Sequence, residues 1–242
     1  MKLLVDIGNT AIKFASVNNG DFSYLFRLYN HEISLEKIKE FIKGDIEEVY
    51  ISSVAPKICS NFKLILKELN ITNIKEIDVS MNKSVEINID DKNELGSDLL
   101  CDIVACKKLY GNSLAIVDFG TATKILFIDK DGVFSSCAIF IGSEQAKKSL
   151  SSATELLPLT ATNVVKPISK CHNTVDVINS SVYYSELYSV KGIINQYESD
   201  VGYKVRVILT GGNASPFIKE FKDAIYDKDL VLKGLYYLIQ GE

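Results

Sequence analysis

The sequence predicts a mixed α/β fold made of two similar halves. The first observation is a short turn with an acidic residue, a glycine and a hydroxyl, which occurs twice about half a chain apart, at Asp6–Thr10 and Asp118–Thr123. The second is that each turn follows an apolar run and leads into another. The third is that apolar patterns of strand and helix period alternate after each turn. Together they favour a duplicated architecture of mixed sheets with flanking helices.

The first half is predicted to open with three strands joined by tight turns. Helices and strands then alternate, and a polar loop precedes a helix that ends at Gly111. In chain order the predicted elements are strands 2–7, 11–18 and 23–28, helix 33–43, strand 49–54, helix 56–69, strand 75–79, loop 80–95 and helix 96–110.

The second half repeats this beginning with three further strands, the last two joined by the hairpin turn Asp129–Gly132. Pro216 is expected in the first turn of a short helix, where proline is tolerated. We expect a hinge near Gly111, which gives domains 1–111 and 112–242. The predicted elements are strands 114–118, 123–129 and 133–140, helix 143–156, loop 159–172, helix 174–198, strand 205–209, the short helix after Pro216, and helix 228–240.

Composition argues against several classes of protein. The net charge of −4 disfavours a nucleic-acid binder that works by neutralising phosphates. No apolar run reaches the roughly 20 residues that span a bilayer. An acid at position 6 comes too early for a signal peptide, and the five cysteines have no metal-ligand spacing. We therefore expect a cytoplasmic protein with reduced thiols, no membrane and no nucleic-acid partner.

The repeated turn is suited to binding a phosphate and its metal. Its aspartate can hold Mg²⁺, directly or through water, and its glycine lets the backbone approach phosphate oxygens. Asn9, Thr10 and Lys13 add hydrogen-bond donors after the first turn. The two commonest nucleotide-binding glycine motifs are missing from the sequence. One such turn alone can be an ordinary turn, but two copies favour two domains that bind one nucleotide.

Two further motifs each allow two interpretations. Gly211 and Gly212 follow the strongest apolar strand of the second half. They either let the backbone lie flat against an adenine or ribose, or form a plain strand-to-helix turn. Asp98 stands in the first turn of a helix, where it either favours the helix dipole or acts as a base that accepts a hydroxyl proton during phosphoryl transfer.

Taken together, the motifs resemble those of type III pantothenate kinases, members of the actin / sugar kinase / Hsp70-like superfamily of duplicated ribonuclease-H-like domains. The resemblance implies two such domains with a cleft between them. It also implies ATP-dependent phosphorylation of pantothenate, the first step of coenzyme A biosynthesis. The stretches that match best are Asp6–Thr10, Leu95–Asp98, Val117–Thr123, Leu150–Pro158 and Leu209–Gly212.

The resemblance also implies roles for the matched residues. Asp98 would be the catalytic base, Asp6 would hold Mg²⁺, and Asp118 would bind a monovalent cation, K⁺ or NH₄⁺. The protein would be a homodimer with the acceptor at the interface, contacted by Thr174 of the partner subunit. The acceptor would lie against Gly96, Ser97 and Asp98. The residues expected to bind ATP and its phosphates are Asp6, Gly8, Asn9, Thr10, Lys13, Gly120, Thr121, Gly211 and Gly212.

The chain departs from the family pattern at several positions. Leu99 replaces an arginine that contacts pantothenate, and a leucine cannot pair with a carboxylate. Of a glycine- and proline-rich family motif, only Ile139 and Gly142 remain. Lys124 either takes the place of the monovalent cation or points outward. These departures leave two alternatives: a catalytically impaired nucleotide-binding or regulatory paralogue, and a kinase for another small alcohol.

Overall fold

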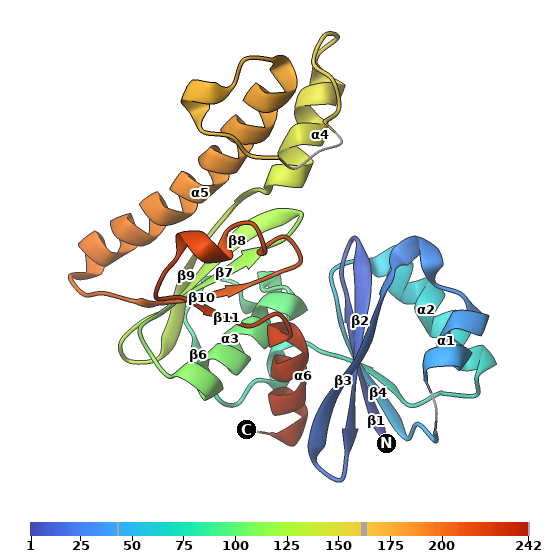
Figure 1. Cartoon of the computed structure of the whole chain (residues 1–242). Helices are drawn as coiled ribbons and strands as arrows, with labels where there is room; N and C mark the ends of the chain where they lie inside the picture. The colour runs from blue at the N-terminus through green and yellow to red at the C-terminus, as the bar shows by residue number, and fades with distance from the viewer. Residues whose placement is uncertain (43, 161–163, 242) are drawn as a thin grey trace. The chain divides into compact units, whose positions relative to one another are not determined.

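The computed structural model of the chain describes residues 1–42, 44–160 and 164–241. Its first sheet has five strands in the order β3-β2-β1-β4-β5 (Figure 1). The central strand β1 is antiparallel to β2 and parallel to β4. The strands are β1 (Lys2–Ile7), β2 (Ala11–Asn18), β3 (Asp21–Tyr29), β4 (Glu48–Ser53) and β5 (Ile74–Glu76).

The second sheet repeats this strand order. It runs β11-β10-β7-β8-β9-β6, so that β7 to β11 take the places of β1 to β5, and β6 is an added edge strand. The predicted duplicated α/β fold is therefore confirmed. The strands are β6 (Glu86–Ile87), β7 (Leu114–Phe119), β8 (Ala122–Ile128), β9 (Val133–Ile141), β10 (Arg206–Thr210) and β11 (Ile225–Tyr226).

Six α-helices accompany the sheets in the described part of the chain. Two of them, α3 and α6, pack in close contact. Their backbones are so near at Gly234 that a Cβ atom there would lie 2.0 Å from the Cys101 carbonyl oxygen. Glycine at this crossing lets the two backbones touch. The helices are α1 (Leu35–Phe41), α2 (Pro56–Glu68), α3 (Ser97–Tyr110), α4 (Ser143–Ala153), α5 (Thr174–Val201) and α6 (Leu230–Gln240).

The chain forms two compact units, each with its own core. The first contains residues 1–112, 128–136 and 229–242, and the second contains 113–127 and 137–228. Helix α6 joins the first unit because it packs on β1, β2 and β4. The predicted domain limits, 1–111 and 112–242, concern the duplicated halves of the chain and remain a prediction.

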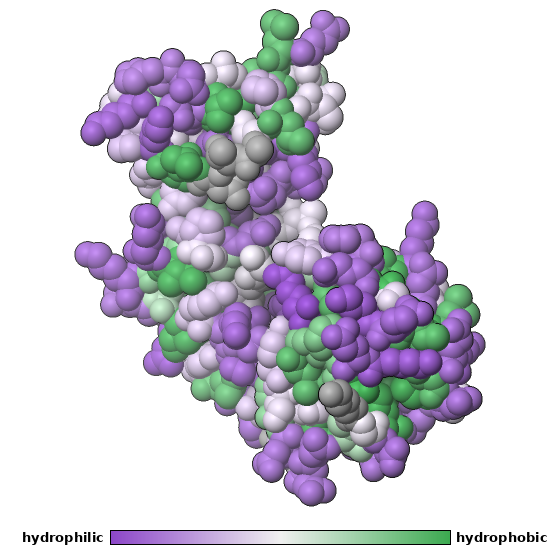
Figure 2. All heavy atoms as spheres, turned by 45° about the vertical axis from the view of Figure 1, so that its right-hand side comes forward, coloured by the Kyte–Doolittle hydropathy of each residue, from purple (hydrophilic) through white to green (hydrophobic). Residues whose placement is uncertain are grey.

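The two cores are built from alternate strand residues and the apolar faces of helices. In the first unit, Phe14 and Phe62 meet edge to face between β2 and α2, and both are fully buried. In the second unit, Leu187 and Val190 of α5 pack with Phe127 of β8. Among the described residues, no helix is long and apolar enough to cross a membrane. Polar side chains cover much of the face drawn in Figure 2, with smaller apolar patches between them.

Four predicted elements differ most from the structure. The strand predicted over 75–79 is β5, which ends at Glu76, and Val79 begins a 3₁₀ turn. The stretch 80–95, predicted as loop, contains β6, which pairs with β9 through Glu86 and Ile87. The helix predicted over 143–156 ends at Ala153, and the short helix after Pro216 is a 3₁₀ turn, Ile218–Glu220, followed by β11. Two-residue strands form by long-range pairing and leave no local periodicity to detect. Residue 43 of one predicted helix and residues 161–163 of the predicted loop lie outside the described residues.

Candidate active site

The first turn holds a carboxylate close to a lysine. Asp6 lies near the end of β1, and the antiparallel register places Lys13 of β2 directly opposite. The Lys13 Nζ is 3.8 Å from Asp6 Oδ2. The Gly8 N–H donates to the Ala11 carbonyl at 3.0 Å, which closes the turn and leaves Asn9 and Thr10 exposed. The turn thus combines a carboxylate, an ammonium group and exposed donors.

Helix α3 begins beside this turn because Ser97 anchors it to β4. The Ser97 Oγ lies 3.0 Å from the Ser52 Oγ and accepts a hydrogen bond from the Ser53 N–H at 2.9 Å. Ser52 is the partner of Asp6 in the parallel β1–β4 ladder. Asp98, the next residue along α3, is thereby held in the same region of the first unit as Asp6.

Three carboxylates act electrostatically on the buried Cys101 thiol. Burial raises the pKa of Cys101 well above its usual value, and the negative charges of Asp102, Asp6 and Asp98 raise it further. Asp102 is fully buried, whereas Asp98 and Asp6 keep 8% and 9% of their surface exposed. Asp98 Oδ1 accepts a hydrogen bond from the Leu99 N–H at 2.8 Å. All three are buried, but only Asp98 and Asp6 keep any exposed surface through which a substrate could contact them.

The second turn carries a shorter ion pair than the first. The Lys124 Nζ is 2.7 Å from Asp118 Oδ2, and both side chains are more than four-fifths buried. Lys124 therefore points toward the turn rather than away from the protein. A lysine ammonium at this distance supplies a positive charge that neutralises the carboxylate.

Glycines surround the second turn because its neighbours approach closer than a side chain allows. A Cβ on Gly142 would lie 2.5 Å from the Gly120 carbonyl oxygen, and the Gly142 N–H donates to the Thr121 carbonyl at 3.1 Å. Gly211 has φ +97, and its Cβ would lie 2.4 Å from Asp118 Oδ1. A side chain at Gly142 or Gly211 would therefore collide with the second turn, which is a direct steric reason for glycine at both positions.

Sequence reasoning missed a buried carboxylate behind this turn. Glu186 of α5 is 4% exposed and accepts hydrogen bonds from the Thr123 Oγ1, the Ser143 Oγ and, at 2.9 Å, the Ser143 N–H. Burial raises the pKa of Glu186, although the bonds from Thr123 and Ser143 oppose the shift. The carboxylate connects the start of α4 to β8. Its position inside a long helix gives no motif by which the sequence could reveal it.

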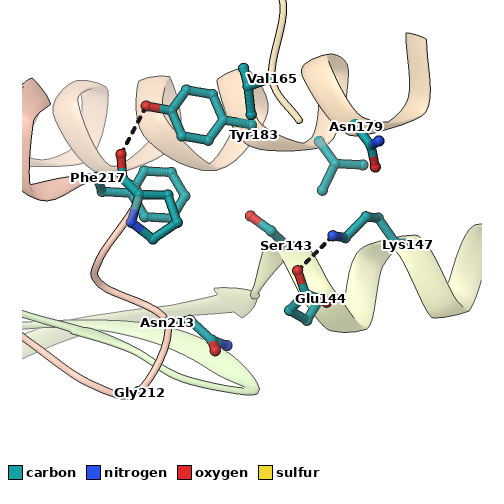
Figure 3. A pocket seen from close by; sticks show the side chains of 11 residues that line it. Ser143, Glu144, Lys147, Val165, Asn179, Tyr183, Gly212, Asn213 and Phe217 are labelled. Atoms are coloured by element: carbon teal, nitrogen blue, oxygen red, sulfur yellow. Dashed lines mark hydrogen bonds and ion pairs between the residues drawn. The ribbon is translucent and has the colours of Figure 1, made fainter. Parts of the chain in front are cut away.

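A cavity of about 390 Å³ adjoins the second turn (Figure 3). Polar side chains of α4 and α5 face it, Val165 lines it from the segment before α5, and the loop after β10 contributes another wall with Gly212 and Asn213. The Lys147 Nζ donates to Glu144 Oε1 at 2.5 Å within the cavity. Its lining residues are Ser143, Glu144, Lys147, Val165, Asn179, Val182, Tyr183, Gly212, Asn213, Pro216 and Phe217.

A stack of three aromatic rings stiffens one wall of this cavity. The rings of Phe119 and Phe217 are 4.5 Å apart, and those of Phe217 and Tyr183 are 4.9 Å apart, all nearly parallel. Phe119 directly precedes Gly120, so the stack joins the second turn to α5. The Tyr183 hydroxyl donates to Glu220 Oε1 at 3.2 Å.

The predicted site residues fall into two groups, one in each unit. The residues of the first turn and of the α3 start lie in the first unit, and those of the second turn lie in the second. Gly211 contacts the second turn, and Gly212 lines the cavity beside it. Thr174 is an exposed residue at the start of α5. Leu99, where the resemblance implies an arginine, is 8% exposed.

Comparison with solved structures defines the class of fold. The chain resembles a conserved protein assigned to the Baf family of transcriptional activators from Campylobacter jejuni, with a TM-score of 0.61 and 22% identity over 98% of this chain and 97% of that one. It also resembles the activator of the 2-hydroxyisocaproyl-CoA dehydratase from Clostridium difficile with bound ADPNP, with a TM-score of 0.54 and 15% identity over 99% and 95%. The fold is that of the actin-like ATPases, with duplicated ribonuclease-H-like domains.

The sequence comparisons give the family. The profile of the type III pantothenate kinases matches residues 2–196. Type III pantothenate kinases of Ehrlichia canis and Kosmotoga olearia are 32% and 31% identical to this chain, over 98% and 97% of it and 95% and 94% of their own lengths. The chain belongs to the type III pantothenate kinase family. Its class is thus the phosphotransferases that use ATP, and the family activity is the phosphorylation of pantothenate in coenzyme A biosynthesis.

Proposed function

We propose that the chain transfers the γ-phosphate of ATP to the hydroxyl of pantothenate through the residues of its two turns and of the α3 start. The observation that carries this proposal is an ion pair that occurs at both turns. In each, an aspartate is paired with a lysine of the following strand, Asp6 with Lys13 and Asp118 with Lys124. The lysine ammonium at each turn can contact phosphate oxygens and neutralise the negative charge that develops during transfer, and an aspartate can bind phosphates through a cation.

In this proposal, ATP phosphates contact Asn9, Thr10 and Lys13 in the first unit, and the Gly120–Thr121 turn in the second. Asp98 accepts the proton of the acceptor hydroxyl, while Gly96 and Ser97 border the acceptor. The backbone at Gly96 comes close to the base, because a Cβ there would lie 2.8 Å from Asp98 Oδ1. Glycine at this position therefore supports the reactive placement of Asp98.

The residues around Asp6 fit a Mg²⁺ ion that accompanies ATP. Among the described residues, no group of three His, Cys, Asp or Glu side chains could hold a metal ion. Magnesium in kinases needs only one or two carboxylates, because substrate phosphates and water supply its other ligands. Asp6 is the carboxylate of the first turn, keeps 9% of its surface exposed, and would hold the ion. Bound Mg²⁺ would neutralise charge on the β- and γ-phosphates.

The base and ribose of ATP are proposed to occupy the cavity beside the second turn. Gly142, next to the cavity residue Ser143, donates to the Thr121 carbonyl, and Asn213 of the opposite wall donates to the Gly120 carbonyl at 3.0 Å. A nucleotide with phosphates at this turn would therefore have its nucleoside next to the cavity. Gly212 would then border the adenosine.

Lys124 is proposed to take the place of a monovalent cation at Asp118. In the absence of K⁺ and NH₄⁺, we expect the wild-type enzyme to keep full turnover, because the ammonium group is already 2.7 Å from Asp118. Lys124→Met should lose turnover and recover part of it when K⁺ is added. The control is Lys148→Met, which removes an exposed lysine of α4 and should change nothing. Wild-type turnover that depended on K⁺ would rule out this role.

The active enzyme is proposed to be a homodimer with the acceptor at its interface and Thr174 donated by the partner. Support comes from exposed apolar residues beside a groove between β9, α4 and α5: Ile139, Ile141 and Leu150 are 60%, 49% and 38% exposed. Apolar surface of this kind marks an association site. Ile139→Asp should shift the sedimenting species from dimer to monomer, whereas Leu64→Asp on α2 should not. A wild-type monomer at assay concentration would contradict the dimer.

The acceptor itself is tested by ADP release with pantothenate, pantetheine and simple alcohols. We expect turnover with pantothenate. Leu99 favours one further candidate, a kinase for an alcohol without a carboxylate, because position 99 offers a buried apolar side chain and no positive charge. Turnover with simple alcohols but not with pantothenate would select this candidate. ATP-analogue binding without turnover on any acceptor would select the impaired paralogue.

We also propose a cytoplasmic location, since all five cysteines are free thiols. Recovery of the protein in a membrane or secreted fraction would contradict this location.

A further inference from the structure

The first and second turns share another structural feature, which no sequence motif indicated. In the first turn, the Gly8 carbonyl accepts a hydrogen bond from the Asn30 Nδ2 at 3.0 Å. In the second, the Gly120 carbonyl accepts one from the Asn213 Nδ2, also at 3.0 Å. Each asparagine therefore holds the carbonyl of the turn's glycine.

Each asparagine also binds its turn through the backbone. The Asn30 N–H donates to the Thr10 carbonyl at 3.0 Å, and the Asn213 N–H donates to the Phe119 carbonyl at 2.9 Å. Two bonds from one residue fix both its backbone and its side chain relative to the turn. Asn30 begins the 3₁₀ turn after β3, whereas Asn213 lies in the loop after β10. These positions are not equivalent in the repeated strand order, so the same contact is reached from two different elements.

The consequence follows from the planarity of the peptide group. In a trans peptide, the carbonyl oxygen of one residue and the N–H of the next point in opposite directions. When Asn30 holds the Gly8 carbonyl, it directs the N–H of Asn9 to the other side of the peptide plane. Asn213 does the same for the N–H of Thr121. Asn9 and Thr121 are both exposed, so these N–H groups belong to residues that a ligand can reach.

We propose that Asn30 and Asn213 are matched positioning residues that orient the Asn9 and Thr121 N–H groups toward the phosphates of ATP. The inference rests on the proposed role of the two turns in phosphate binding. Backbone N–H groups bind phosphate oxygens well only when they are fixed before the ligand arrives. Without the asparagine amide, the glycine peptide can rotate, because glycine restricts its backbone less than any other residue.

The experiment compares Asn30→Ala and Asn213→Ala with a matched control, Asn112→Ala. In the control position, the Asn112 Nδ2 donates to the Lys130 carbonyl at 3.0 Å and so holds the β8–β9 hairpin turn instead. Calorimetry with Mg²⁺ and a non-hydrolysable ATP analogue gives Kd, and steady-state kinetics give the KM for ATP and for pantothenate. Each site variant should weaken Kd and raise the KM for ATP about tenfold, which corresponds to about 1.4 kcal/mol. The KM for pantothenate should stay at its wild-type value.

A general loss of structure would have a different signature. It would raise both KM values and lower Tm, whereas the inference requires an effect on ATP alone, absent from Asn112→Ala. If Asn30→Ala does not fold, Asn30→Asp keeps the shape of the side chain, removes the donor and should weaken ATP-analogue binding at least as much. Unchanged Kd in either site variant, or an equal loss in Asn112→Ala, would overturn the inference. Analogue binding by a wild-type chain that does not phosphorylate pantothenate would contradict the proposed function and leave this test intact.

Discussion

Replacing Asp98 with asparagine is expected to lower kcat for pantothenate phosphorylation by about 10²–10⁴-fold, because the variant cannot accept the hydroxyl proton. The fold should be retained, since the asparagine Oδ1 can still accept the Leu99 N–H that Asp98 Oδ1 accepts at 2.8 Å. Binding of Mg²⁺ and a non-hydrolysable ATP analogue should remain at the wild-type level. Single-turnover kinetics measure the chemical step, and calorimetry measures the binding.

The control for this prediction is Asp102→Asn, one helical turn further along α3. Asp102 is fully buried, so an acceptor hydroxyl cannot reach it, and its substitution should change Tm rather than kcat. Both carboxylates contribute to the raised pKa of Cys101, so the two variants alter charge in the same region. If Asp102→Asn abolished turnover while Asp98→Asn kept it, the base would have to be reassigned to Asp102.

The repeated turn made the duplicated fold predictable from the sequence. Each copy follows an apolar strand, and the strand and helix periods after it are local features that a sequence displays directly. The elements that were missed, β6 and β11, are two-residue pairings. They depend on which distant strand lies alongside them, and no local pattern encodes that. The strand order is the same around β1 and around β7. No local pattern predicts that order, so only the duplication of the turn indicated that the two sheets would share it.

The candidate site was predictable where its residues lie in turns and not where they support those turns. Asp6 and Asp118 stand next to glycines and hydroxyls, a combination with a chemical meaning of its own. Asn30 and Glu186 act through partners 22 and 43 residues away, Gly8 and Ser143 respectively, and look like ordinary residues in the sequence. The direction of Lys124 also had to come from the structure, because a strand residue after a turn can face either side.

The second turn lies so close to Gly211 that a side chain at this position is expected to lower stability strongly. Gly211→Ala is expected to destabilise the protein by about 3 kcal/mol, from the strain of a positive φ and from the collision of the new Cβ with the turn. For a chain of this size, that lowers Tm by roughly 6–12 °C. The methyl group would stand 2.4 Å from both Asp118 Oδ1 and the Phe119 carbonyl oxygen, so the carboxylate must move away from Lys124. The KM for ATP should therefore rise at temperatures where the variant is still folded.

Gly202→Ala separates the two causes. Gly202 ends α5 with φ +76, but a Cβ there meets nothing within 4 Å, so this variant suffers the backbone strain without the collision. It should cost about 1 kcal/mol, lower Tm by roughly 2–4 °C and leave the KM for ATP unchanged. Equal Tm losses in the two variants, with wild-type KM values in both, would mean that the second turn tolerates a side chain at Gly211. The geometry of the second turn would then not depend on the glycine, and Asp118 would keep its contact with Lys124 despite the added methyl group.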